Sequence, residues 1–290
     1  MLAPLRSYYA GMTGVQPTKA VVLARGLGTR MRRAGTALSA AQARIADMGL
    51  KAMMPIGQEE QAGIGGRPFV DYVISALADA GIIDVCLVIG PEHQLVRDYY
   101  TAVRPERVAI HYAEQTEPLG TGDAVRAAEA FAGDDRFVMV NSDNYYSASS
   151  LRLLAAAPGT ALVGFDAATM VARSNIPAER LASFAIVDTD AHGHLVDILE
   201  KPSPDELRAR GEHALVSMNC FLFSPSIFPA CASIGRSPRG EYEIVDAVRA
   251  LVSAGEAVSV VRADDAVLDL SGRSDVPAVM AALDGQDVRL

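Results

Sequence analysis

A glycine-containing loop near the start of the chain carries residue types well suited to binding phosphate. Residues 20–24 (AVVLA) are aliphatic, and residues 25–31 (RGLGTRM) include Gly26, Gly28, Thr29 and Arg30. Glycine lets the backbone approach a ligand closely, and a hydroxyl and a guanidinium both suit phosphate oxygens. A buried strand that ends in such a loop is typical of nucleotide sites in open α/β sheets. The loop matches neither the P-loop nor the dinucleotide-binding pattern.

Lysine is rare in this chain, and its positions point to the same chemistry. The lysines are Lys19, Lys51 and Lys201, and arginine is far more frequent. A compact ammonium on a flexible stem suits a phosphate in a narrow pocket. Because the net charge is −9, a polyphosphate site requires cations gathered locally. The alternative is that these lysines lie on the surface by chance.

A carboxylate, Asp143, closely follows the apolar run at residues 136–141. The carboxyl ends of parallel strands form the edge of the sheet at which ligands bind. Mg²⁺ accepts one or two carboxylates together with phosphate oxygens and water. We therefore expect Asp143 to hold Mg²⁺, the alternative being a turn-forming aspartate within Ser-Asp-Asn.

Length and composition limit the class of protein. At 290 residues and 50% hydrophobic, the chain can bury a large core. The negative charge argues against nucleic acid and anionic membranes as partners, and no apolar run is as long as a membrane span. Cys86, Cys220 and Cys231 lack metal-type spacing, so we expect reduced thiols in a cytoplasmic protein.

Strand-like and helix-like segments alternate along the chain, which predicts an α/β fold with a mostly parallel mixed sheet flanked by helices. Residues 1–17 show no periodicity and are expected to be a loose leader, and residues 190–193 (DAHG) indicate a hairpin. Strands are expected at 20–24, 84–89, 108–112, 136–141, 160–165, 183–188, 195–200, 214–223, 258–262 and 266–270. Helices are expected at 69–80, 92–101, 122–131, 148–156, 242–254 and 274–283.

Six ordered segments together resemble the sugar-1-phosphate nucleotidylyltransferases, also called nucleotide-sugar pyrophosphorylases. The resemblance covers roughly residues 18–285, and six segments in order are far more specific than one glycine loop. The segments are 23–31 (LARGLGTRM), 51–56 (KAMMPI), 67–72 (RPFVDY), 115–124 (QTEPLGTGDA), 140–144 (VNSDN) and 200–202 (EKP).

This resemblance implies a Rossmann-like core of the glycosyltransferase-A type and a Mg²⁺-dependent reaction. A sugar-1-phosphate oxygen attacks the α-phosphorus of an NTP, and pyrophosphate leaves. The phosphate nucleophile is already ionised, so catalysis rests on positioning and electrostatics. The resemblance assigns catalytic roles to Arg30, Lys51 and Asp143, and makes Asp269 the second metal ligand. Asp264 and Asp265 lie near Asp269, so its register is open.

The nucleotide-binding residues follow from the same resemblance. The amide of Gln115 can both donate to and accept from a pyrimidine edge, which favours UTP or dTTP, although GTP-using relatives carry a similar segment. Gly120 would allow the backbone to approach the base. The nucleotide-binding set is Leu23, Ala24, Arg25, Gly26, Gly28, Thr29, Gln115, Gly120 and Thr121.

On the sugar side, the resemblance assigns the sugar phosphate to Lys201 and sugar hydroxyls to Glu200. A Glu–Lys pair with a purely structural role is the alternative. Asn219 could bond a sugar hydroxyl or satisfy strand backbone, and Ala185 stands where a glycine often faces the sugar. We expect a single nucleotidyltransferase domain over residues 18–290, with a nucleotide half at about 18–145 and a sugar-phosphate half at about 146–290.

Three departures from the family pattern keep the substrate open. Arg25 replaces a small residue beside the base, Leu50 replaces a proline, and Ala185 replaces a glycine. A heptose, cyclitol or phosphoalcohol phosphate therefore remains an alternative acceptor. Residues 33–49, with an Ala-rich helix at 37–47, and residues 58–64 are apparent insertions; a lid, an oligomer contact and an inert surface segment are the candidate roles.

Other classes of protein also remain open. A catalytically silent nucleotide-sugar-binding regulator would be expected to lack the metal carboxylate or the phosphate cations, and this chain keeps Arg30, Lys51, Asp143 and Lys201. A dinucleotide oxidoreductase would need an acidic residue about 20 positions past the glycine loop in a βαβ unit, where Asp47 falls in the insertion. A homo-oligomer is a further expectation.

Overall fold

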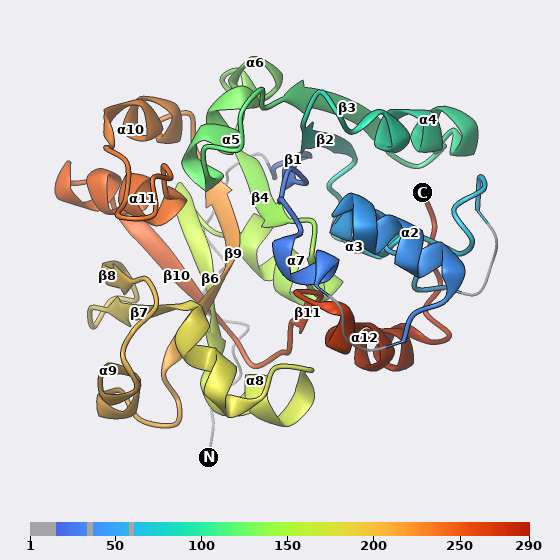
Figure 1. Ribbon diagram of the computed structural model, residues 1–290. Helices are drawn as coiled ribbons and strands as arrows, with labels where there is room; N and C mark the ends of the chain where they lie inside the picture. The colour runs from blue at the N-terminus through green and yellow to red at the C-terminus, as the bar shows by residue number, and fades with distance from the viewer. Residues whose placement is uncertain (1–15, 34–36, 58–60) are drawn as a thin grey trace.

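The computed structural model describes residues 16–33, 37–57 and 61–290 (Figure 1). All but the last two residues of the expected leader at 1–17 lie outside this range. Residues 34–36 and 58–60, within the two expected insertions, lie outside it as well.

One mixed sheet of nine described strands organises the fold, in the order β10-β6-β9-β4-β1-β2-β3, with β7 beside β9 and β8 beside β7. Strands β4, β1, β2 and β3 are mutually parallel, as the alternating pattern predicts. The described strands are β1 (Lys19–Leu23), β2 (Asp84–Ile89), β3 (Ala109–Glu114), β4 (Phe137–Asn141), β5 (Asn144–Tyr145), β6 (Thr160–Asp166), β7 (Ala185–Thr189), β8 (Leu195–Leu199), β9 (Leu215–Phe223), β10 (Val258–Ala263) and β11 (Leu268–Asp269).

Successive residues of the central strands point to two separate hydrophobic cores, one on each face of the sheet. In β1, Ala20 and Val22 pack into one core, and Val21 packs into the other. This is the period of two that a strand imposes on its side chains. Both faces are apolar, which is why the strands read as continuous hydrophobic runs in the sequence.

Helices cover both faces of the sheet. Figure 1 shows α5, α10 and α11 grouped on one side of the sheet, with α2, α3 and α12 on the other. The described helices are α1 (Thr29–Arg32), α2 (Ala40–Met48), α3 (Phe69–Asp79), α4 (Gln94–Val103), α5 (Thr121–Ala127), α6 (Glu129–Ala132), α7 (Ala148–Ala155), α8 (Ala167–Arg173), α9 (Pro204–Ala209), α10 (Ile227–Ser233), α11 (Ile244–Ser253) and α12 (Val276–Leu283), with 3₁₀ turns η2 (Lys51–Met53), η3 (Ala178–Ser183) and η4 (Arg273–Asp275).

Strand β9 joins the two halves of the sheet and runs antiparallel to both β4 and β6. The predicted hairpin is confirmed: β7 and β8 pair antiparallel, and Asp190 Oδ1 accepts hydrogen bonds from the N–H groups of His192 and His194, each at 2.8 Å. A separate two-stranded sheet pairs β11 with β5, so that Asp269 lies opposite Asn144.

The predicted elements are confirmed with few changes. The strand expected at 84–89 has these bounds, whereas the helix expected at 122–131 is divided at Ala128 into α5 and α6. Helices α8, α9 and α10 lack an expected counterpart because each is only six or seven residues long, too short to show a clear period. Within the described ranges, no helix is both long and apolar enough to cross a membrane.

The expected helix of the first insertion is confirmed as α2, and it is built into the core. Ile45 and Ala46 are fully buried. Ser39 and Gln42 form a capping box at its start, which fixes its first residue. At its other end Arg32 donates to Met48 O at 2.9 Å. Helix α2 is therefore in contact with α1, the helix that follows the glycine loop.

Candidate active site

The glycine loop leaves the carboxyl end of β1 between the ends of two neighbouring strands. Ala24 N donates to Val88 O at 2.9 Å, and Leu23 O accepts from Ser142 N at 3.1 Å. A Cβ added at Gly26 would meet no atom within 4 Å, so space is open beside this backbone. The loop therefore presents accessible backbone at the ligand-binding edge of the sheet.

Gly28 has a different reason to be glycine. Its φ is +59°, and an added Cβ would lie 2.3 Å from the carbonyl oxygen of Gly49. Thr29 begins α1 directly after it, and both Thr29 and Arg30 are exposed. The close contact between Gly28 and Gly49 positions the glycine loop next to η2, the 3₁₀ turn that carries Lys51.

Lys51 and Asp143 form an ion pair at this edge, with Nζ and Oδ2 3.0 Å apart. Both side chains are mostly buried, at 18% and 26% exposed. The pKa of Lys51 is raised, chiefly by the charge of Asp143, while the nearby Arg30 opposes the rise. Three residues predicted from separate sequence segments therefore lie together.

Asp269 joins this group through the small β5–β11 sheet. Leu270 N donates to Asp143 O at 2.8 Å, so the backbones of the two aspartates run side by side. Burial raises the pKa of Asp269, and the negative charge of Asp143 raises it further. The nearby Asp265 instead accepts hydrogen bonds from Ser147 and Ser150.

The two carboxylates form an oxygen donor set that a hard cation could use. The Asp269 carboxylate forms an ion pair with Arg180 and accepts a hydrogen bond from Asn144 Nδ2 at 2.9 Å. Arg180 also pairs with Asp275 at 3.0 Å. Over the described ranges, no cluster of three or more His, Cys, Asp or Glu side chains could hold a metal ion. Mg²⁺ fits two carboxylates because it takes its other ligands from phosphates and water.

Arg180 and Asn144 are site residues that the sequence analysis missed. The position of Asn144 could have been predicted, because it directly follows Asp143 in the chain. Arg180 lies 89 positions from Asp269, and no local pattern links the two. Its pairing depends on where η3 packs.

On the nucleotide side, Gln115 is buried and its orientation is set by two acceptors. Its Nε2 donates to Gly120 O at 3.0 Å and to Asp123 Oδ2 at 2.8 Å. A Cβ on Gly120 would lie 2.6 Å from Tyr242 O. Thr121 Oγ1 accepts from Ile244 N at 2.9 Å. Gly120 and Thr121 thus hold this loop against the start of α11. The sequence predicted only that they would contact the base, and this packing role is additional.

On the sugar side, two predicted residues adopt backbone that is uncommon for residues other than glycine. Lys201 has φ +49° and Asn219 has φ +55°. Asn219 lies in β9 where the register with β6 shifts, a bulge that can turn a side chain toward a site. Left-handed backbone at such positions is often retained for function.

Glu200 and Lys201 do not join the Lys51–Asp143 group through any contact in the described structure. Burial raises the pKa of Glu200, against the lowering effects of Lys201, Arg239 and Arg249. Ala185 is buried and pairs with Ser217 of β9. The predicted residues of the phosphate and metal site therefore lie over β1 and β4, and those of the sugar side lie beside β7, β8 and β9. The predicted base-side residues Gln115, Gly120 and Thr121 follow β3.

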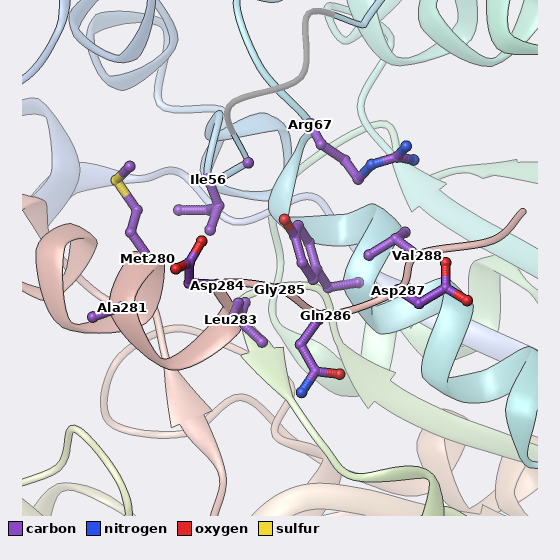
Figure 2. Close-up of a pocket in the computed structure, with 12 residues that line it drawn as sticks. Ile56, Arg67, Met280, Ala281, Leu283, Asp284, Gly285, Gln286, Asp287 and Val288 are labelled. Carbon is purple, nitrogen blue, oxygen red and sulfur yellow. The ribbon is translucent and has the colours of Figure 1, made fainter.

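The structure also contains a cavity of about 550 Å³. Figure 2 shows Arg67 and Asp287 on one side of it and Met280 and Ala281 on the other. None of its lining residues belongs to the predicted site.

Comparison with known proteins identifies the family to which the chain belongs. A family model described as nucleotidyl transferase matches residues 19–276, so the chain belongs to the nucleotidyl transferase family. It is 32% identical over 243 residues to a glucose-1-phosphate thymidylyltransferase of Streptomyces griseus, covering 83% of this chain and 59% of that protein.

Two further proteins are similar. A UTP–glucose-1-phosphate uridylyltransferase of Bacillus subtilis is 28% identical over 256 residues, covering 80% of this chain and 77% of its own length. A crystal structure of a UDP-glucose pyrophosphorylase complexed with UDP-glucose matches with a TM-score of 0.71 at 17% identity, covering 93% of this chain and 100% of that one. The expected Rossmann-like nucleotidyltransferase fold is thereby confirmed.

Proposed function

We propose that this chain transfers a nucleotidyl group from UTP or dTTP to a sugar-1-phosphate, giving an NDP-sugar and pyrophosphate. The observation that carries the proposal is the 3.0 Å Lys51–Asp143 pair, with Asp269 beside it, at the edge where the glycine loop begins. Relatives named as thymidylyl- and uridylyltransferases of glucose-1-phosphate support the choice of base and acceptor.

The chemistry requires little proton transfer. An ionised phosphate oxygen of the sugar-1-phosphate forms a bond to the α-phosphorus, and the bond from that phosphorus to the bridging oxygen breaks as pyrophosphate leaves. Arg30 and Lys51 offset the negative charge of the nucleotide and of the departing pyrophosphate. The accessible backbone at Gly26 and the hydroxyl of Thr29 orient the triphosphate, while Leu23, Ala24 and Gln115 line the base side.

The reaction depends on Mg²⁺ held by Asp143 and Asp269. The two oxygen donors fit this ion, because burial and the negative charge of Asp143 both raise the pKa of Asp269, and a divalent cation would stabilise the ionised carboxylate against both effects. When bound, Mg²⁺ supplies positive charge to the phosphate oxygens. The protein's part is to keep the two carboxylates adjacent through the β5–β11 pairing.

The sugar phosphate is assigned to Lys201, and sugar hydroxyls to Glu200 and Asn219, with Ala185 lining the same subsite. The unusual backbone at Lys201 and Asn219 supports this assignment. We further propose that residues 18–290 act as one domain, since strands from both halves share one sheet. A cytoplasmic location accords with the three buried, unpaired cysteines, and we propose small-molecule substrates as the partners of this site.

The test is pyrophosphate release with Mg²⁺ and paired NTP and sugar-1-phosphate substrates, in the wild type and in Asp143→Asn. The variant is expected to lose activity by at least about 100-fold, because it removes a metal carboxylate, while it remains folded. Asp135→Asn is the matched control: Asp135 pairs with Lys19 at 2.8 Å at the opposite end of β1. Wild-type activity in Asp143→Asn, or no release that needs both substrates in the wild type, would refute the proposal.

A further inference from the structure

The side chain of Arg25 is a feature of the nucleotide edge that the chemistry above does not use. It is only 6% exposed and lies 3.3 Å from Glu92 Oε2, while its Nη2 donates to Thr116 O at 3.0 Å. Its Nε and Nη1 are buried and have no hydrogen-bond partner in the part of the chain that the structure describes. Buried donors without an acceptor are uncommon because each costs desolvation energy that no bond returns.

This guanidinium spans the ends of three neighbouring strands. Arg25 lies just after β1, Gly90 just after β2 and Thr116 just after β3. A Cβ added on Gly90 would lie 2.7 Å from Arg25 Nε, so the side chain crosses directly over the end of β2. Ligands of open α/β sheets bind outside these carboxyl ends. The side chain therefore connects the glycine loop to the segment that begins with Gln115.

The hydrogen-bonding capacity of Arg25 and Gln115 is complementary. A guanidinium only donates. Gln115 uses its Nε2 for Gly120 O and Asp123 Oδ2, so its Oε1 remains as an acceptor. Arg25 bonds the carbonyl of Thr116, the residue directly after Gln115, so the two side chains bring a donor and an acceptor to the same segment. Such a pair matches a base that presents a ring N–H next to a carbonyl. Uracil, thymine and guanine present that pattern, whereas the corresponding ring nitrogen of cytosine and adenine is an acceptor, next to an amino group.

We propose that Arg25 determines nucleobase specificity by donating a hydrogen bond to the carbonyl next to the ring N–H of the base. The inference rests on the proposed function, because it requires that the base lies at this edge. An amino group at the same position would face a second donor, which leaves both unpaired and disfavours cytosine and adenine. A small residue at this position, as in the family pattern, cannot make that contact.

The test is the ratio of kcat/KM for UTP to that for CTP, with dTTP, GTP and ATP measured in parallel, in the wild type, Arg25→Ala and Arg25→Lys. The wild type is expected to prefer UTP, dTTP or GTP. Arg25→Ala is expected to lower the UTP-to-CTP ratio by about 10- to 100-fold, the effect of one hydrogen bond from a charged donor. Arg25→Lys, which keeps a donor, is expected to recover part of the ratio.

Arg107→Ala is the matched control. Arg107 also has a buried Nη1 without a partner among the described residues and pairs with Asp79 at 2.6 Å, but it precedes β3 and so lies at the opposite edge of the sheet. Its loss is expected to leave the ratio unchanged. An equal decrease for all five nucleotides in Arg25→Ala, an unchanged ratio, or a wild-type preference for ATP or CTP would each overturn the inference.

The two proposals can fail separately. If the wild type turns over no NTP, the proposed function fails, and calorimetric binding of UTP and CTP to the wild type and to Arg25→Ala still tests base selection. Binding that does not discriminate between the two bases, or a preference that survives in Arg25→Ala, refutes the role of Arg25.

Discussion

Replacing Lys51 by methionine tests the central ion pair, because it keeps most of the side-chain volume and removes the charge. At 3.0 Å and an effective dielectric of 20, the attraction between Lys51 and Asp143 is about 5.5 kcal/mol before desolvation is subtracted. We expect a net loss of about 1–3 kcal/mol in the free energy of unfolding. Each kcal/mol corresponds to about 2–4 °C in Tm for a domain somewhat smaller than this one.

The same variant should affect metal binding and activity in opposite directions. In Lys51→Met, no lysine ammonium offsets the repulsion between the carboxylates of Asp143 and Asp269. Binding of Mg²⁺ should therefore raise Tm more in Lys51→Met than in the wild type. The value of kcat/KM should fall by about 10²–10³, because a cation facing the phosphates is lost.

Thermal unfolding with and without Mg²⁺, together with pyrophosphate release, measures these effects. Lys19→Met is the control, since it breaks the Lys19–Asp135 pair far from the site and should leave kcat/KM unchanged. Wild-type kcat/KM in Lys51→Met, or a Mg²⁺ response no larger than that of the wild type, would show that Lys51 does not act at the phosphate and metal site.

Two further predictions concern pH and the sugar subsite. Burial raises the pKa of Asp71 from 3.8 to about 6, against the hydrogen bonds from Tyr99 and Tyr100. Its contribution to stability is therefore fully present below about pH 4 and is lost as the pH rises through about 6, a change of about 3 kcal/mol. Tm measured from pH 4 to 7.5 should fall less steeply in Asp71→Asn, and parallel curves would contradict this. Lys201→Ala should raise KM for the sugar phosphate more than for the NTP in steady-state kinetics; an effect confined to the NTP would reassign Lys201.

Much of the fold follows from local patterns in the sequence. The central strands are buried on both faces, so they appear as unbroken apolar runs, and the strand expected at 84–89 has those bounds in the structure. Parallel strands share one ligand-binding edge, which is why Arg30 and Asp143 could be expected to lie near each other. Asp143 is in contact with Lys51, and the charge of Arg30 acts on the same lysine.

Contacts between residues that are distant in the sequence were decided only by the tertiary structure. Arg180 reaches Asp269 across 89 positions, and the bulge in β9 gives Asn219 its left-handed backbone. Gly120 must be glycine because Tyr242 approaches it, a contact between distant segments. The sequence by itself determined which residue types gather at the strand ends, since periodicity and turn chemistry are local. The direction of the Arg25 guanidinium and the partners of each buried charge depend on how the elements pack.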